Sequence, residues 1–287
     1  MIFEEWHSLI KLRAYVSLAR PLNAFITFLG VCAAGYIAGA KAADYPIILF
    51  ASCAAALLGA AGNCVNDVFD VEIDKVNKPK RAIAAGVVTE SEAWIFAVVL
   101  ASAGLVMSGF CGSMPFIIAC FTTILMYAYS VSLKRIPLVG NLAVATLTAL
   151  VFIYGAAVLS HPAYGFIPAV FALLTNFARE ILKDVEDMEG DAAQGVVTYP
   201  LFAGVRPALG LVTAMFLSTM ILALLPFYYR IYSDVYLWII LSGVEPVFIF
   251  FIVSIWRWPS KENIGRIALL LKYDMLIGMA ALVLGSR

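Results

Sequence analysis

Apolar stretches long enough to cross a bilayer dominate the chain. A spanning helix needs about 20 such residues, and nine stretches approach or exceed that length. They cover residues 22–40, 46–66, 92–110, 114–131, 138–160, 163–182, 206–226, 234–256 and 265–285. The short strands of alternating polarity that mark a membrane barrel do not recur along the sequence. The pattern predicts an all-α polytopic membrane protein of about nine transmembrane helices, forming a single domain over residues 1–287.

Composition agrees with this pattern. Of the 287 residues, 63% are apolar and 13% are charged, against about 25% charged in ordinary soluble domains, and the mean hydropathy is +0.95. A net charge of zero argues against nucleic-acid binding and intrinsic disorder. Residues 1–15 lack the pattern of a cleaved signal. With Trp6, Lys11 and Arg13 they predict an interfacial amphipathic helix before the first span.

Basic residues set the expected orientation. Fifteen of the 19 Lys and Arg residues fall on the side that holds the N-terminus and the loops after the even-numbered spans. The other four are Lys41, Arg230 and Arg287 on the opposite side and Lys272 within the ninth span. The positive-inside rule predicts a multi-pass protein of the cell membrane with the basic side in the cytoplasm.

Acidic residues concentrate in two segments that extend the second and sixth spans on this basic side. NDVFDVEID, at 66–74, holds four carboxylates, and EILKDVEDMEGD, at 180–191, holds six. Asp70 and Asp187 are 117 residues apart, as are Asp74 and Asp191. This matched spacing predicts two four-helix pseudo-repeats, each presenting one acidic helix end, followed by a ninth helix.

Helical geometry gathers each acidic segment onto one stripe. Asn66, Asp70 and Asp74 would fall within about 80° of one another, with Asp67 beside them. The second stripe would hold Asn176, Glu180, Asp184, Asp187 and Asp191. Such crowded oxygens suit Mg²⁺. A solvated helix end without a ligand explains one cluster equally well, but two matched clusters favour metal binding.

Basic side chains lie close to both acidic segments. Arg20 begins the first span, Arg81 closes the loop KVNKPKR, Lys134 follows the fourth span, and Arg179 and Lys183 interleave with the second stripe. Ordinary membrane orientation accounts for any one of them. Together with bound Mg²⁺ they predict a diphosphate site. At the rim of an apolar bundle, this site suits a substrate with a diphosphate head and a long apolar tail.

The motifs resemble those of one family. NDVFDVEID is similar to the N-D-x-x-D-x-x-x-D motif of the UbiA superfamily of intramembrane prenyltransferases, and KDVEDMEGD to its second motif, D-x-x-D-x-x-x-D. RPLN at 20–23, NKPKR at 77–81 and YSVSLKR at 129–135 match the family in the same order. The resemblance covers essentially the whole chain.

The resemblance implies a prenyltransferase in which two Mg²⁺ ions hold the donor diphosphate and the Asp side chains are catalytic. The implied metal ligands are Asn66, Asp67, Asp70 and Asp74 for one ion and Asp184, Asp187 and Asp191 for the other. The implied substrate contacts are Arg20, Asn23, Asn66, Arg81, Lys134, Arg179 and Lys183. Many members place Tyr where this chain has Arg179, which suggests an anionic acceptor.

The sequence around Arg179 is most similar to that of the archaeal branch of the family, which makes digeranylgeranylglyceryl phosphate. That branch implies geranylgeranyl diphosphate as donor and geranylgeranylglyceryl phosphate as acceptor. An aromatic acceptor, such as 4-hydroxybenzoate or a quinone precursor, is the alternative. A cation-coupled transporter is a further alternative, although its site would lie nearer the midplane. Glu245, Lys272 and Asp274 fall inside spans and predict either a structural ion pair or a functional role.

Overall fold

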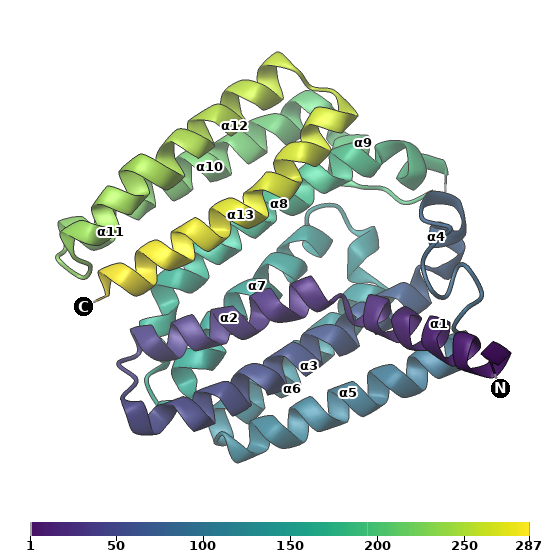
Figure 1. Ribbon diagram of the computed structural model, residues 1–287. Helices are drawn as coiled ribbons and strands as arrows, with labels where there is room; N and C mark the ends of the chain where they lie inside the picture. Colours follow the sequence, from purple (N-terminus) through teal and green to yellow (C-terminus); the bar gives the residue numbers. More distant parts are fainter. Residues whose placement is uncertain (1, 194, 287) are drawn as a thin grey trace.

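The computed structural model describes residues 2–193 and 195–286, and this part of the chain is helical and contains no strand (Figure 1). The helices are α1 (Ile2–Ala19), α2 (Pro21–Ile37), α3 (Tyr45–Phe69), α4 (Val71–Asn77), α5 (Glu90–Phe110), α6 (Ser113–Val131), α7 (Val139–Ala157), α8 (Phe166–Ala193), α9 (Tyr199–Ala203), α10 (Val205–Tyr228), α11 (Asp234–Ile239), α12 (Glu245–Arg257) and α13 (Lys261–Gly285). The prediction of an all-α polytopic membrane protein is confirmed.

Nine spans are present if the bent first helix pair is one of them. Eight segments of the described chain are individually long and apolar enough to cross a membrane. The ninth combines residues Leu9–Ala19 of α1 with α2, which meet at a bend of 45°. The bend falls at Arg20, whose φ of 50° is left-handed, directly before Pro21. Proline disfavours a helical conformation in the residue before it, so the helix breaks there.

The predicted eighth span is irregular. Between α11 and α12 the chain forms a π-helical turn, Ile240–Val244. Pro246 lies just after this turn, at the second position of α12. A proline within a continuous span removes one i→i−4 hydrogen bond, and a local π-helical turn accommodates the loss.

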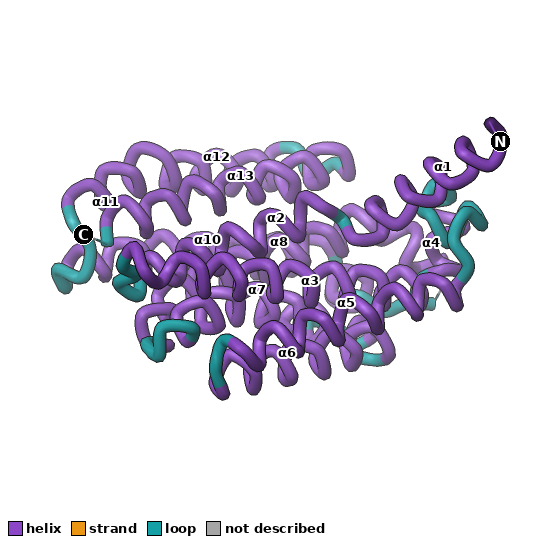
Figure 2. The backbone as a smooth tube through the Cα atoms, turned by 60° about the horizontal axis from the view of Figure 1, so that its bottom comes forward, coloured by secondary structure: helices purple, strands orange, loops and turns teal. Residues whose placement is uncertain are grey.

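The helices form two groups joined by α7 and α8 (Figures 1 and 2). In one group α3 packs against α2 and α5, and in the other α10 packs against α8 and α12. α7 contacts both α2 and α8. Its approach to α2 depends on Gly155, where an added Cβ would lie 2.7 Å from the carbonyl oxygen of Val31. α3 in the first group and α8 beside the second each carry one acidic segment, and the organisation into two pseudo-repeats stays a prediction.

The two acidic segments differ in backbone structure. α8 continues 11 residues past the apolar run 163–182, so the second segment lies on one unbroken helix. The helical geometry assumed for 66–74 is interrupted at one residue, because α3 ends at Phe69 and α4 begins at Val71. Asp70 joins them with φ −100° and ψ 7°. Aspartate is a poor helix former, and the side chain of Asp70 is held by tertiary contacts instead.

Candidate active site

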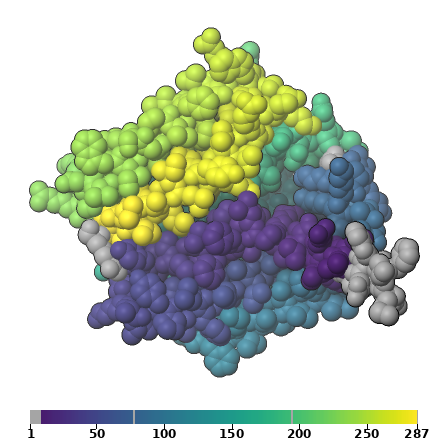
Figure 3. Space-filling view, in the orientation of Figure 1, coloured from purple at the N-terminus to yellow at the C-terminus, as the bar shows by residue number. Residues whose placement is uncertain are grey.

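A cavity of about 890 Å³ runs between the two groups of helices. Apolar side chains such as Leu58, Leu147 and Phe171 line its interior, and the acidic residues at the C-terminal ends of α3 and α8 mark a charged end. Figure 3 shows the surface hollowed between α13, in yellow, and the purple N-terminal helices. The cavity volume lies within the range of about 300–1,000 Å³ that is usual for small-molecule sites.

The first acidic segment supplies one wall of the charged end. Asn66, Asp70 and Asp74 all line the cavity. Asp70 accepts a hydrogen bond from Nδ2 of Asn66 at 2.7 Å and forms an ion pair with Lys134. Arg81 donates to Asp74 at 2.5 Å. Burial raises the pKa of Asp74 above its usual value, and the Arg81 guanidinium opposes this shift.

Asp67 lies behind this wall. Its side chain is 6% exposed and forms ion pairs with both Arg20 and Arg81, the latter at 3.0 Å. Arg20 also donates to Asn63 at 3.4 Å. Arg20 and Arg81 line the cavity, whereas Asp67 is not among the lining residues. In this arrangement Asp67 positions two arginines toward the cavity.

We therefore expect Asp67→Asn to act through these arginines. The amide removes the negative charge between them, so their orientation loosens and the donor KM rises about tenfold or more, the cost of one charged hydrogen bond. The apparent affinity for Mg²⁺ should change little. A Mg²⁺ titration of activity at saturating donor measures this directly. A large loss of Mg²⁺ affinity with unchanged donor KM would instead identify Asp67 as a metal ligand.

The second acidic segment supplies the opposite wall. Asp184, Asp187 and Asp191 of α8 line the cavity, and Asn141 of α7 donates to Asp184 at 2.8 Å. Asp70, Asp74, Asp187 and Asp191 line the same cavity, and α4 contacts α8, so the two acidic segments lie close to each other. The sequence pattern predicted this meeting of distant motifs.

The donor set fits Mg²⁺. The Oδ1 atom of Asn66 is buried and has no hydrogen-bond partner within the described chain, and it adjoins Asp70. No three His, Cys, Asp or Glu side chains of the described residues are grouped to hold an ion by themselves. Mg²⁺ commonly combines one or two carboxylates with waters and substrate phosphates. Asn66, Asp70 and Asp74 would serve one wall, and Asp184, Asp187 and Asp191 the other.

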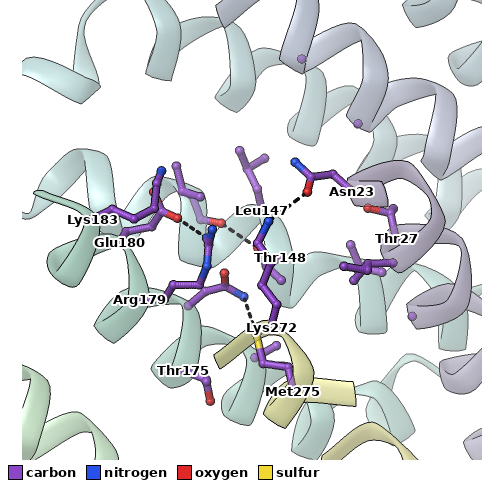
Figure 4. A pocket seen from close by; sticks show the side chains of 18 of the residues that line it. Asn23, Thr27, Leu147, Thr148, Thr175, Arg179, Glu180, Lys183, Lys272 and Met275 are labelled. Carbon is purple, nitrogen blue, oxygen red and sulfur yellow. Dashed lines mark hydrogen bonds and ion pairs between the residues drawn. The ribbon is translucent and has the colours of Figure 1, made fainter. Parts of the chain in front are cut away.

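Glu180 lies at the site, although the sequence analysis names it neither as a metal ligand nor as a substrate contact. It is buried on α8, lines the cavity, and pairs with Arg179 at 2.6 Å and Lys183 at 3.2 Å (Figure 4). Nε of Arg179 also donates to the carbonyl oxygen of Ala268 on α13, at 3.2 Å. Glu180 therefore holds two of the predicted substrate contacts in place. Its position on the predicted acidic stripe was the available signal.

The charges inside spans do not form the predicted structural ion pair. Nζ of Lys272 donates to Oδ1 of Asn23 at 3.4 Å. Glu245 and Asp274 each leave one buried oxygen without a hydrogen-bond partner in the described part of the chain. Of the two alternatives, the structural ion pair is not formed, and Lys272 instead lines the cavity beside Asn23 of α2.

A helical membrane bundle with two acidic motifs beside an apolar cavity is the arrangement expected of an intramembrane prenyltransferase. The UbiA prenyltransferase family model matches residues 25–274, and the chain belongs to this family. It is thus an enzyme, a prenyltransferase, and the transporter alternative is set aside. Digeranylgeranylglyceryl phosphate synthase of Methanopyrus kandleri is 36% identical over 270 residues, covering 94% of this chain and 98% of that protein. The same enzyme of Methanosphaera stadtmanae is 34% identical over 272 residues, covering 95% and 98%.

Solved structures are similar in fold. A structure of digeranylgeranylglyceryl phosphate synthase matches with a TM-score of 0.78 and 30% identity, over 96% of this chain and 98% of that one. A UbiA homologue from Archaeoglobus fulgidus, bound to GPP and Mg²⁺, matches with a TM-score of 0.67 and 18% identity, over 94% and 99%. The first confirms the fold along nearly the whole chain.

Proposed function

We propose that this prenyltransferase transfers a geranylgeranyl group from geranylgeranyl diphosphate to geranylgeranylglyceryl phosphate. The product carries the second ether bond of archaeal membrane lipids. The observation that carries the proposal is the pair of facing acidic walls, with their cations, at one end of an apolar cavity. The substrates are inferred from the end-to-end similarity to digeranylgeranylglyceryl phosphate synthases.

The donor diphosphate would lie between the two acidic walls. Two Mg²⁺ ions bound there would neutralise charge on the leaving diphosphate. Lys134, Arg81 and Lys183 line the same end of the cavity and would contact phosphate oxygens. The apolar interior would hold the prenyl tail, where its main contribution is orientation because a tail in the bilayer is already out of water.

Transfer breaks the allylic C–O bond of the donor, and its electron pair leaves with diphosphate. The acceptor hydroxyl oxygen forms the new C–O bond and gives up its proton to an oxygen of diphosphate or of a cavity carboxylate. Cations fixed before reaction stabilise the developing charge without reorganising. The ion pairs of Lys134 with Asp70 and of Arg81 with Asp74 supply this preorganisation.

We also propose the cellular arrangement. The acidic walls lie on the side that carries most Lys and Arg residues, so the positive-inside rule places the site at the cytoplasmic face of the cell membrane. The cavity is lined by helices from α2 to α13, so residues 1–287 would act as one prenyltransferase domain. Membrane lipids would surround the outward-facing apolar side chains.

An acceptor competition assay tests the proposal. Purified protein in liposomes receives labelled geranylgeranyl diphosphate and Mg²⁺, with geranylgeranylglyceryl phosphate and 4-hydroxybenzoate offered together. We expect a labelled diether phosphate that disappears with EDTA and returns when Mg²⁺ is restored. A labelled aromatic product would reassign the acceptor, and EDTA-resistant transfer would contradict the metal-dependent site.

A further inference from the structure

Lys272 is a charged residue inside a membrane helix that the proposed diphosphate site does not use. It lies 11 residues into α13, or about 16 Å along the helix axis. Its ammonium lines the cavity and donates only a long hydrogen bond, 3.4 Å, to Asn23. Among the described residues no carboxylate lies within ion-pair distance of it. A cation inside a membrane bundle is costly and usually meets a partner or a ligand.

The charge balance around Lys272 is positive. Figure 4 shows Arg179, Glu180 and Lys183 of α8 lining the same cavity as Lys272 of α13. Glu180 is already paired with Arg179 and Lys183, and Arg20 is paired with Asp67. Lys183 is assigned to the donor diphosphate, so Glu180 counts against Arg179 and Lys272 and leaves one positive charge. This charge favours an anionic ligand, and a phosphomonoester carries a charge of about −1.5 to −2 at neutral pH.

Arg179 and Lys272 are not part of the acidic walls. Arg179 precedes Asp184 by five residues on the unbroken helix α8, which corresponds to about 7.5 Å along its axis. Diphosphate binding between the walls requires metal ions to offset the carboxylates. The surroundings of Lys272 already have an excess of positive charge and require no metal.

We propose that Lys272, together with Arg179 and Asn23, forms a metal-independent subsite for the phosphomonoester of the acceptor lipid, apart from the donor diphosphate site. The inference rests on the proposed function and adds to it the place where the acceptor head binds. The acceptor phosphate replaces Asn23 as the main partner of the Lys272 ammonium. Arg179, anchored by Glu180 and Ala268, presents its guanidinium to the same phosphate.

Binding and kinetics of Lys272→Gln test the subsite. In detergent with EDTA and without donor, titration calorimetry compares geranylgeranylglyceryl phosphate with its dephosphorylated alcohol. We expect the variant to raise the Kd of the phosphorylated lipid at least about tenfold, the value of one charged hydrogen bond, without changing that of the alcohol. In turnover assays the acceptor KM rises and the donor KM stays unchanged. Lys272→Arg should restore most of the affinity.

Lys261→Gln is the matched control, because Lys261 lies at the exposed start of the same helix and pairs with Glu189. It should behave as wild type. Equal weakening of both lipids by Lys272→Gln would show a packing role and overturn the inference, as would a changed donor KM. Inorganic phosphate binding as tightly as the lipid phosphate would assign the site to free phosphate.

Different experimental results would contradict the Lys272 subsite and the proposed reaction. Lys272-dependent lipid-phosphate binding by a protein that transfers nothing to that lipid would overturn only the proposed reaction. Normal transfer with Lys272→Gln indistinguishable from wild type would overturn only the subsite.

Discussion

Replacing Asp70 or Asp191 by alanine should lower kcat for prenyl transfer by at least about 10²–10³-fold, the usual cost of one preorganised electrostatic group at a reacting centre. The two carboxylates lie on opposite walls of the cavity mouth, so neither can replace the other. Asp70 also pairs with Lys134, and its loss frees that cation. Single-turnover rates at saturating Mg²⁺ and donor measure the effect.

Glu189→Gln provides the control for these variants. Glu189 lies on the same acidic stretch of α8, but its side chain is 88% exposed and its partner Lys261 lies at 3.4 Å. Its substitution removes one negative charge beside the motif without touching the cavity, so turnover should stay near the wild-type value. Near-normal turnover in either Asp→Ala variant would contradict the role of the two walls.

Replacing Glu180 by alanine should destabilise the protein by about 3 kcal/mol, the lower end of the range for breaking a buried ion pair. The side chain is 10% exposed and pairs with two cations. Its loss leaves Arg179 with an unpaired charge between α8 and α13. Thermal unfolding in detergent should show a midpoint lower by several degrees. Added geranylgeranylglyceryl phosphate should reverse part of this decrease in the midpoint.

The matched control is Glu72→Ala. Glu72 also pairs with a lysine, Lys75, at 2.6 Å, but its side chain is 83% exposed. Exposed pairs contribute about 0–1 kcal/mol, so the midpoint should hardly change. Equal effects of the two substitutions would show that the Glu180 cluster adds no more than a surface ion pair.

The sequence predicted the helices and the meeting of the two acidic segments because both follow from hydropathy. A span must be apolar and charges must leave it, so carboxylates concentrated at matched span ends point to one side of one bundle. The predicted limits of a span were inaccurate where a charged segment continues the helix beyond the apolar run. Hydropathy ended the sixth span at 182, yet α8 continues to Ala193.

Individual contacts were less predictable, since they depend on how helices rotate against each other. Asp67 and Asp70 stand in one motif, yet Asp67 turns behind the wall to Arg20 while Asp70 faces the cavity and Lys134. Lys272 and Asp274 are two residues apart on one helix, and only the packing of α13 decides that Lys272 reaches Asn23. Periodicity gives relative angles within a helix but not its rotation in the bundle.

The unbroken helix α8 makes the enzyme unequally tolerant of changes in chain length. It carries Arg179 and Glu180 as well as Asp184, Asp187 and Asp191. One residue inserted after Lys183 would turn all later side chains by about 100° and advance them by about 1.5 Å. The loop at 78–89 can absorb an insertion beyond the first acidic segment. An insertion within α8 would instead change the spacing between Arg179 and the carboxylates, and with it the distance between the two proposed substrate head sites.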